Sequence, residues 1–306
     1  MAKTKPPRFR NRNVGKAHDL LVPLAIVALA TGSSCRANDY QPGDWVPFPP
    51  GKTLLVGYAE LSASSKLDNS IVGDVPHSHL ESEIGIVRFQ HYIRIGKSVG
   101  SVQVILPFGS INHAKIGGRQ VRSASGVADP VVAAGIWFIN NPTRKLWVSA
   151  LNFVSIPVGT YRQGRSLNLA SHRWQNDLQA DVTKGLSDQV TVDVSLDWIH
   201  PWDNREAGTG HQRLNQKDIV ATYAWLSYTL PSKAVLSAGY AGIYGGAQRL
   251  DGVRTGSKAG EQQIRLAYSQ FINPKLQGLV QVSHDLGASG QFKQRLGVLV
   301  RVAKVF

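Results

Sequence analysis

Cysteine, methionine and long apolar runs are scarce in this chain of 306 residues. It holds one cysteine and one methionine, too little cysteine for a disulfide scaffold. No apolar run reaches about 18 residues, so the sequence contains no transmembrane helix. Runs with the 3.6-residue period of an amphipathic helix are also hard to find, whereas alternation with a period of two recurs. The fold is therefore predicted to be all-β.

Residues 1–37 have the order of a secretory signal peptide. Basic residues precede the apolar stretch LLVPLAIVALA at 20–30, and small residues follow it. This stretch is too short to cross a bilayer, so we expect export and cleavage after Gly32 or Ala37. Cys35 would suit a lipoprotein, but Gly32 stands where such sites have a Leu-like residue. Cleavage after Ala37 removes a net charge of +6 and leaves about +8 of the formal +14, which weakens a nucleic-acid interpretation.

The segment QVTVDVSLDWIH at 189–200 is the clearest alternating run, because Val, Leu and Trp occupy one face and Thr, Ser and Asp the other. Similar runs recur along the chain. Their approximate ranges are 52–62, 81–95, 98–108, 129–139, 145–156, 172–183, 188–200, 216–230, 233–244, 261–272, 275–286 and 291–306. Most exceed the usual globular strand of about 5–6 residues and are typical of tilted membrane-spanning strands.

The connections between these runs alternate between short turns and long polar loops, apart from a short last one at 287–290. Because every backbone group in hydrocarbon must be paired, a sheet spans a membrane only when it closes. We therefore predict a closed antiparallel transmembrane β-barrel of about 12 strands, with short periplasmic turns and longer extracellular loops. Residues 38–51 would be a periplasmic N-terminal segment and 52–306 the barrel. A soluble periplasmic β-sandwich or barrel remains the alternative.

Three motifs occur in order along the mature chain. VPFPPGK leads into the first strand, GVADPVVAAGIWF opens another, and IPVGTYRQGRSLNLASHRWQNDL at 156–178 precedes a third. Together they resemble the outer-membrane barrel family named for the MetA pathway of phenol degradation. The family-motif residues are Pro49, Pro50, Gly51, Asp129, Pro130, Pro157, Gly159, Tyr161 and Trp174, and His172 stands where the family pattern has Asn. The resemblance implies a transport protein near aromatic catabolism.

If the apolar strand faces meet lipid, the charges on the opposite faces point into the lumen. Acids would come from two adjacent strands and bases from strands roughly across the barrel. The predicted lumen-lining residues are Asp177, Asp181, Asp193, Asp197, Arg265, Arg295 and Arg301. Such a lumen would order water and select polar solutes. The alternative is a narrow barrel filled by its own salt bridges.

The long loops carry most of the basic excess of the mature chain. Their main basic residues are Lys115, Arg119, Arg122, Arg162, Arg165, Arg249 and Arg254. A basic outer rim would bind anionic lipopolysaccharide and attract anionic solutes. Aromatic residues cluster toward the strand ends, where interfacial girdles are expected, and a path for aromatic substrates is the alternative. They are Trp137, Phe138, Trp147, Trp174, Trp198, Trp202, Tyr223, Trp225, Tyr228, Tyr240 and Tyr244.

We assign no catalytic residue, cofactor or metal centre to this sequence. His77 and His79 could form a surface metal site, but a solvated loop is the simpler interpretation. Ser283-His284-Asp285 looks like a triad in sequence, yet neighbouring strand residues point to opposite faces and cannot converge. An outer-membrane lipid-modifying enzyme is therefore the third hypothesis.

The C-terminal stretch GVLVRVAKVF resembles the assembly signal of outer-membrane barrels, through Gly297, Val300, Val302 and Phe306. It would pair with residues 52–62, remove the open sheet edge and be recognised by the barrel assembly machinery. The whole sequence thus predicts a Gram-negative outer-membrane channel for passive uptake of small, hydrophobic or aromatic compounds. The alternative function is a closed-lumen structural or surface-interaction barrel whose loops bind lipopolysaccharide or a partner.

Overall fold

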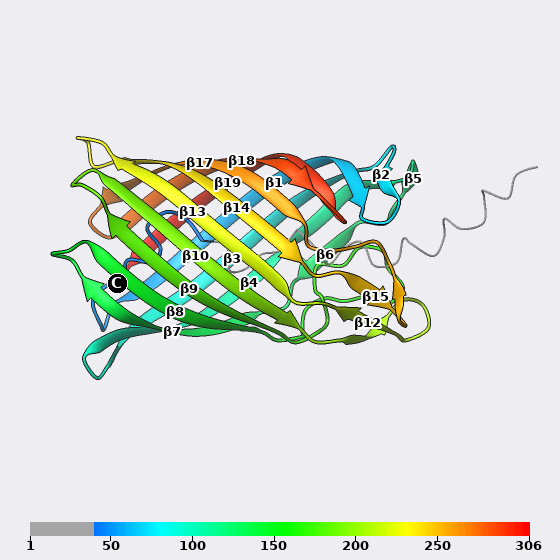
Figure 1. Cartoon of the computed structure of the whole chain (residues 1–306), viewed down its shortest axis with the longest axis horizontal. Helices are drawn as coiled ribbons and strands as arrows, with labels where there is room; N and C mark the ends of the chain where they lie inside the picture. The colour runs from blue at the N-terminus through cyan, green and yellow to red at the C-terminus, as the bar shows by residue number, and fades with distance from the viewer. Residues whose placement is uncertain (1–39) are drawn as a thin grey trace, which may run out of the picture.

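The predicted alternation forms twelve long strands within residues 40–306, the part of the chain that the computed structural model describes (Figure 1). They are β1 (Thr53–Asn69), β3 (His79–Ile95), β4 (Ser98–Ile116), β7 (Val131–Asn141), β8 (Leu146–Ser155), β9 (Gln175–Gly185), β10 (Val190–Pro201), β13 (Ile219–Thr229), β14 (Val235–Gly245), β17 (Glu261–Asn273), β18 (Leu276–Ala288) and β19 (Phe292–Val305). Residues 1–39 lie outside the described part, and the predicted signal peptide and Cys35 lie there with them.

Each long strand pairs antiparallel with the next, and β19 pairs with β1. The closing ladder runs in one register from Leu54 opposite Val305 to Ala63 opposite Leu296 and continues, beyond two register shifts, to Leu67 opposite Phe292. The predicted closed barrel of twelve strands and the predicted partner of the last strand are confirmed. Closure leaves no sheet edge in the membrane.

The connections also follow the predicted rhythm. Short turns and the C-terminus lie at one end of the barrel, and longer loops extend from the other end (Figure 1). These loops contain short strands, namely β2 (Gly73–Val75), β5 (Arg119–Gln120), β6 (Ala124–Val127), β11 (Asn204–Ala207), β12 (Gln212–Gln216), β15 (Gln248–Leu250) and β16 (Val253–Arg254). Strands β11, β12, β15 and β16 form a small separate sheet over the loop end.

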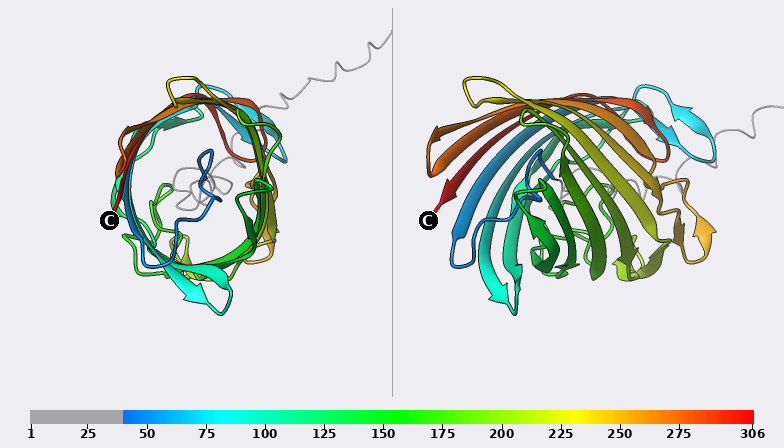
Figure 2. Two further views of the ribbon diagram at one scale, coloured as in Figure 1. Left: turned by 90° about the vertical axis from the view of Figure 1, so that its left-hand side faces the viewer. Right: turned by 60° about the vertical axis from the view of Figure 1, so that its left-hand side comes forward.

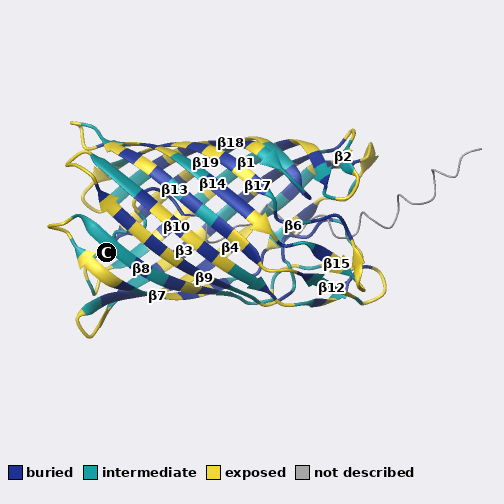
Figure 3. Ribbon diagram, in the orientation of Figure 1, coloured by how far each residue is buried: buried dark blue, intermediate teal, exposed yellow. Residues whose placement is uncertain are grey.

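Burial alternates along the strands, so that the barrel wall shows a chequered pattern (Figure 3). On β10, Val194, Leu196 and Trp198 are exposed, whereas Asp193 and Asp197 are fully buried. An apolar outer face with charged residues inside is the inverse of a water-soluble protein and suits a barrel surrounded by lipid. Residues 40–306 include no helix that is long and apolar enough to cross a membrane.

Candidate functional site in the barrel interior

Residues 40–50, which we call the plug, lie inside the barrel near the short-turn end (Figure 2). Tyr40, Gln41 and Trp45 are each about 1% exposed or less. The sequence indicated only a periplasmic segment over 38–51, and its described part enters the lumen. No periodic pattern marks these residues, because the plug has no regular secondary structure.

Aromatic residues of the wall hold the plug by its backbone. The indole N–H of Trp137 donates to the Trp45 carbonyl at 2.7 Å, and that of Trp225 donates to the Tyr40 carbonyl at 3.4 Å. The rings of Tyr40 and Trp45 stack with centroids 5.3 Å apart. The girdle prediction is therefore wrong for Trp137, Tyr223 and Trp225, which are only 2% exposed and face the lumen.

The other girdle candidates differ among themselves. Phe138, Trp174, Trp198, Trp202, Tyr228 and Tyr244 are exposed, and Trp147 and Tyr240 are half-buried. On β13 both faces are apolar, because Val220 and Leu226 alternate with Tyr223 and Trp225. The pattern on this strand therefore did not indicate which aromatic rings face lipid.

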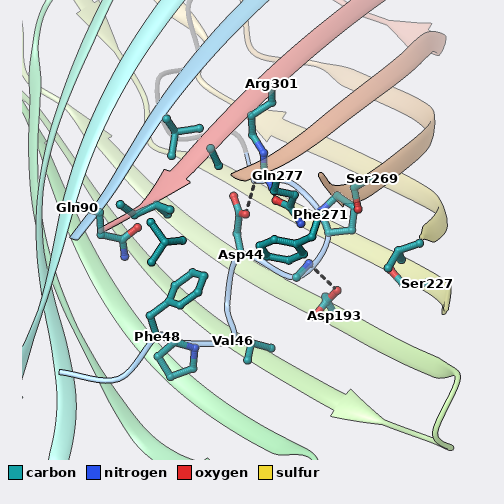
Figure 4. Close-up of a pocket in the computed structure, with 18 of the residues that line it drawn as sticks. Asp44, Val46, Phe48, Gln90, Asp193, Ser227, Ser269, Phe271, Gln277 and Arg301 are labelled. Carbon is teal, nitrogen blue, oxygen red and sulfur yellow. Dashed lines mark hydrogen bonds and ion pairs between the residues drawn. The ribbon is translucent and has the colours of Figure 1, made fainter. Parts of the chain in front are cut away.

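Two buried arginines of the wall, Arg88 and Arg301, pair with the single carboxylate of the plug, and Figure 4 draws the pair of Arg301 with Asp44. Arg301 Nη1 lies 2.6 Å from Asp44 Oδ1, and Arg88 Nη1 lies 3.6 Å from Asp44 Oδ2. The Nη2 group of each arginine donates to a wall glutamine, that of Arg301 to Gln277 at 2.5 Å and that of Arg88 to Gln90 at 2.9 Å. We call Arg88 and Arg301 the arginine clamp. The sequence missed Arg88, because the inward positions before it on β3 are Ile84 and Ile86.

The predicted acidic residues line the opposite wall. Asp177 and Asp181 on β9, and Asp193 and Asp197 on β10, are at most 2% exposed. Their carboxylates accept hydrogen bonds from Ser149 to Asp181, from Thr183 to Asp193 and from Gln179 to Asp197, at 3.0, 2.6 and 2.9 Å. Asp193 also accepts the backbone N–H of Gly43 in the plug at 3.3 Å (Figure 4). The plug therefore bridges an acidic wall and the arginine clamp.

The two remaining predicted lumen residues behave differently. Arg265 is buried inside, where its Nε donates to Gln263 at 2.7 Å and its guanidinium covers the ring of Tyr223. Arg295 is exposed, so its predicted place in the lumen is wrong. The β1–β19 register shifts beside it, and Arg295 and Leu296 bulge outward between Gln294 and Gly297. A bulge shifts the alternation by one residue.

A cavity of about 390 Å³ lies between the plug and the wall (Figure 4). It reaches the arginine clamp and Asp193, and Ser227, Ser269 and Gln277 add further polar groups. Phe48 and Phe271 supply aromatic surface. The cavity therefore offers both apolar and charged surface to a small molecule, within the usual size range of ligand pockets, about 300–1,000 Å³.

Apolar side chains line the lumen over β3, β4, β7 and β8. They form one cluster with the plug, and its members include Ile84, Ile105, Ala133, Leu151 and Phe153. Leu167 and Leu169 belong to the same cluster, although they come from loop 156–174 at the opposite end. This loop, which we call the inward loop, thus enters the mouth of the barrel.

Asp129 anchors the inward loop and joins two of the family motifs. Its carboxylate accepts the backbone N–H groups of Gly159, Ser171 and His172 at 3.1, 2.8 and 3.0 Å, and the Ser171 hydroxyl at 2.8 Å. A Cβ at Gly159 would come within 2.6 Å of the Ala128 carbonyl carbon, so only glycine fits this contact.

The other motif residues hold turns and rings. Burial raises the pKa of the Tyr161 hydroxyl, which donates to the Glu206 carbonyl at 3.2 Å. Pro49-Pro50-Gly51 turns the chain from the plug into β1, because Gly51 has a φ of +90° and its N–H donates to Tyr92. Trp174 is about half exposed beside Trp202, whose N–H donates to its carbonyl. Pro157 and Pro130 flank the same entry to β7, where the Ile156 N–H donates to the Pro130 carbonyl.

Four of the loop arginines gather around a second cavity of about 530 Å³. Arg119 and Arg122 come from the loop after β4, and Arg162 and Arg165 from the inward loop. Arg165 Nη1 donates to the Ser123 carbonyl at 3.2 Å and so joins the two loops. This basic cavity lies at the loop end, away from the plug.

The side chains of Ser283 and Asp285 point inward and are buried, whereas His284 is exposed and its Nδ1–H donates to the Arg295 carbonyl at 2.6 Å. The prediction that these three side chains diverge is confirmed. His77 and His79 belong to no group of three or more metal-ligating side chains within residues 40–306.

The assembly-signal residues lie along the closing strand. Val300 and Val302 are exposed to lipid, and Gly297 faces the lumen beside Ser283 and Gln294. Phe306 is half exposed, with Lys304 Nζ 4.8 Å from its ring centre. Lys304 thus lies at the membrane boundary, where its ammonium can reach water.

Comparisons with known proteins agree with this architecture. Residues 64–300 match the family described as "Putative MetA-pathway of phenol degradation"; the motifs at Asp129 and Tyr161 lie within the match, and Pro49–Gly51 lie before it. The COG4313 outer membrane channel from Pseudomonas putida F1 is 26% identical, with a TM-score of 0.81 over 88% of this chain and 100% of that chain.

A more distant solved structure shares the fold alone. The translocator domain of the autotransporter NalP from Neisseria meningitidis is 12% identical, with a TM-score of 0.51 over 86% of this chain and 90% of that chain. A search of curated proteins finds no match. The family match spans most of the barrel, so this chain belongs to the MetA-pathway phenol-degradation family of outer-membrane β-barrels, with the architecture of a channel.

Proposed function

We propose that this protein is a passive outer-membrane channel for small compounds that combine an apolar or aromatic body with a polar group. The observation that carries the proposal is the two-sided lumen. Apolar side chains over β3–β8 face a wall with four aspartates, and both surfaces line one continuous interior. A solute with one apolar and one polar side could slide between them without losing either kind of contact.

The plug would be the gate of this channel. It contacts the wall through hydrogen bonds, through the ion pairs of Asp44 and through the ring contact of Tyr40 with Phe153, and it forms no part of either sheet. Export by the signal peptide and assembly by the barrel machinery belong to the same proposal.

Reconstitution tests the channel directly. The purified full chain and the Asp44→Asn variant are inserted into planar bilayers, where conductance is measured. Both proteins are also inserted into liposomes, where the rate of swelling is measured in benzyl alcohol and in a sugar. We expect rare openings from the native chain and frequent openings from the variant. Relative to protein-free liposomes, the protein should increase the swelling rate more for benzyl alcohol than for the sugar. Absence of conductance from both proteins, with folding verified by heat-modifiable gel mobility, would contradict the channel.

The second candidate is a closed barrel that acts through its loops. The cavity lined by Arg119, Arg122, Arg162 and Arg165 supports it, since guanidinium groups bind the phosphates of lipopolysaccharide. Binding of purified lipopolysaccharide that is lost in an Arg119→Gln, Arg162→Gln variant, together with absent conductance, would favour this function.

A further inference from the structure

The arginine clamp is built as a carboxylate site, and Asp44 of the plug occupies it. The side chains of Arg88 and Arg301 are 7% and 5% exposed. Gln90 and Gln277 each accept a hydrogen bond from one Nη2, while both Nη1 atoms face Asp44: that of Arg301 donates to its carboxylate at 2.6 Å, and that of Arg88 lies 3.6 Å from it. Charge-assisted hydrogen bonds of this kind are the strongest that arginine makes, and they select carboxylate geometry.

The clamp belongs to the barrel wall, whereas its counter-ion belongs to the removable segment. Arg88 lies on β3 and Arg301 on β19. The ion pairs that these two arginines make within residues 40–306 both go to Asp44. When the plug leaves, the two cations lose that partner and face the lumen without it, and neighbouring charges of one sign on a concave wall attract anions. An anion from the lumen would therefore be drawn to the same position.

The cavity beside the clamp gives such an anion a way in. It extends from Arg88 and Arg301 to Phe48 and Phe271, and Tyr92 lies on the same lining. Its volume of about 390 Å³ exceeds that of a benzene ring with one carboxylate. The carboxylate would meet the guanidinium groups while the ring contacts Phe271 and Tyr92, which belong to the wall and stay in place when the plug and its Phe48 leave.

We propose that the clamp binds the carboxylate of a small aromatic acid, which competes with Asp44 and so releases the plug. This inference rests on the proposed channel function and deepens it, since it names the class of solute that opens the channel. Asp44 is tethered to the barrel and acts as a competitor at millimolar effective concentration. The acid therefore binds weakly to the native chain, in the millimolar range, and more tightly once Asp44 is neutral.

Single-channel recording of the full chain tests the competition. Benzoate is compared with benzamide, which has the same shape and no charge. We expect benzoate to raise the open fraction of the native protein several-fold and benzamide to leave it unchanged. Asp44→Asn should open about tenfold more often without benzoate, because it loses a charge-assisted contact, and should no longer respond to benzoate. Arg301→Gln should also lose the response. Asp188→Asn, on an exposed turn at the same end, is the matched control.

A binding measurement does not depend on conductance. Equilibrium dialysis with labelled benzoate should give at least about tenfold tighter binding to Asp44→Asn than to the native protein, because the competitor is gone. Equal binding to the two proteins, or equal effects of benzoate and benzamide, would overturn the inference. If Asp44→Asn conducts while benzoate has no effect on the native protein, the channel function stands and the carboxylate inference fails. If neither protein conducts, the channel function fails, and dialysis alone decides whether the clamp is a carboxylate site.

Discussion

Asp129 accepts two hydrogen bonds from Ser171, one from its backbone N–H at 2.8 Å and one from its hydroxyl at 2.8 Å. The two residues lie 42 positions apart in the chain, at the start of β7 and at the end of the inward loop. This contact explains in physical terms why an Asp-Pro strand entry and a Pro-x-Gly-x-Tyr loop occur together, since the aspartate holds the loop by its backbone.

Replacing Asp129 by Asn should therefore release the inward loop. An amide offers one acceptor oxygen where the carboxylate offers two, and at least one buried N–H donor would lose its partner. We expect a cost of about 2 kcal/mol in loop docking, or roughly thirtyfold faster trypsin cleavage at Arg162 and Arg165. Digestion of the folded barrel in detergent measures this rate. Asp188→Asn serves as the control, and an unchanged cleavage rate in Asp129→Asn would refute the anchoring role.

His172 should accept Asn but not a β-branched residue. Its φ of +53° lies in the left-handed region, which Asn tolerates and Val does not. The Asn that the family pattern has here is thus explained by the backbone. His172→Asn loses the stacking with Tyr161, whose ring centre is 4.7 Å away, and should change stability by about 1 kcal/mol or less. His172→Val should cost about 2 kcal/mol.

The temperature at which the folded band disappears from a gel compares these variants. Gln163→Val, an exposed change in the same loop without a positive φ, is the matched control. Equal melting of His172→Val and Gln163→Val would show that the left-handed backbone at 172 carries no strain.

The acidic wall should set the ion selectivity of the open channel. Two carboxylates about 8 Å from a passing ion in water contribute about 0.5 kcal/mol each. The double change Asp193→Asn, Asp197→Asn should therefore disfavour cations about fivefold and favour anions about fivefold, so that the cation-to-anion permeability ratio falls by about thirtyfold. Reversal potentials in a salt gradient give this ratio, with Asp44→Asn as the background so that the plug does not limit the current. A ratio that stays constant would mean that ions do not pass this wall.

Much of the fold was predictable because a barrel wall follows one local rule. Lipid on one side and lumen on the other impose a period of two on every strand, as the run through Val194, Leu196 and Trp198 shows. The aspartates of β9 and β10 were predictable for the same reason, since a lone charge between lipid-facing residues must point inward.

The rest depends on contacts that leave no local pattern. The plug has no periodicity, and its place in the lumen follows from pairing Asp44 with Arg301, 257 positions away. Arg88 follows two inward isoleucines on β3 and so resembled part of an apolar face. The prediction for Arg295 was wrong because a bulge shifts by one residue which side chains point into the lumen, and nothing in the amino-acid composition marks the bulge.

Phe306 provides the last test, because it links closure of the barrel to its assembly. Its N–H donates to the Thr53 carbonyl at 2.8 Å, and the Thr53 N–H donates back at 3.4 Å. Deleting Phe306 removes both bonds and the ring, whereas Phe306→Ala removes the ring alone. Two hydrogen bonds contribute only about 1–2 kcal/mol to the folded barrel, so a large loss of assembled protein in both variants would come from recognition of the ring. We expect this loss in both variants, measured as the amount of the heat-modifiable folded band in gels of the membrane fraction. Phe138 is exposed on β7 near the short-turn end, where Phe306 also lies, and the control variant Phe138→Ala should assemble normally. If Phe306→Ala assembles as well as this control, the terminal ring is not an assembly signal.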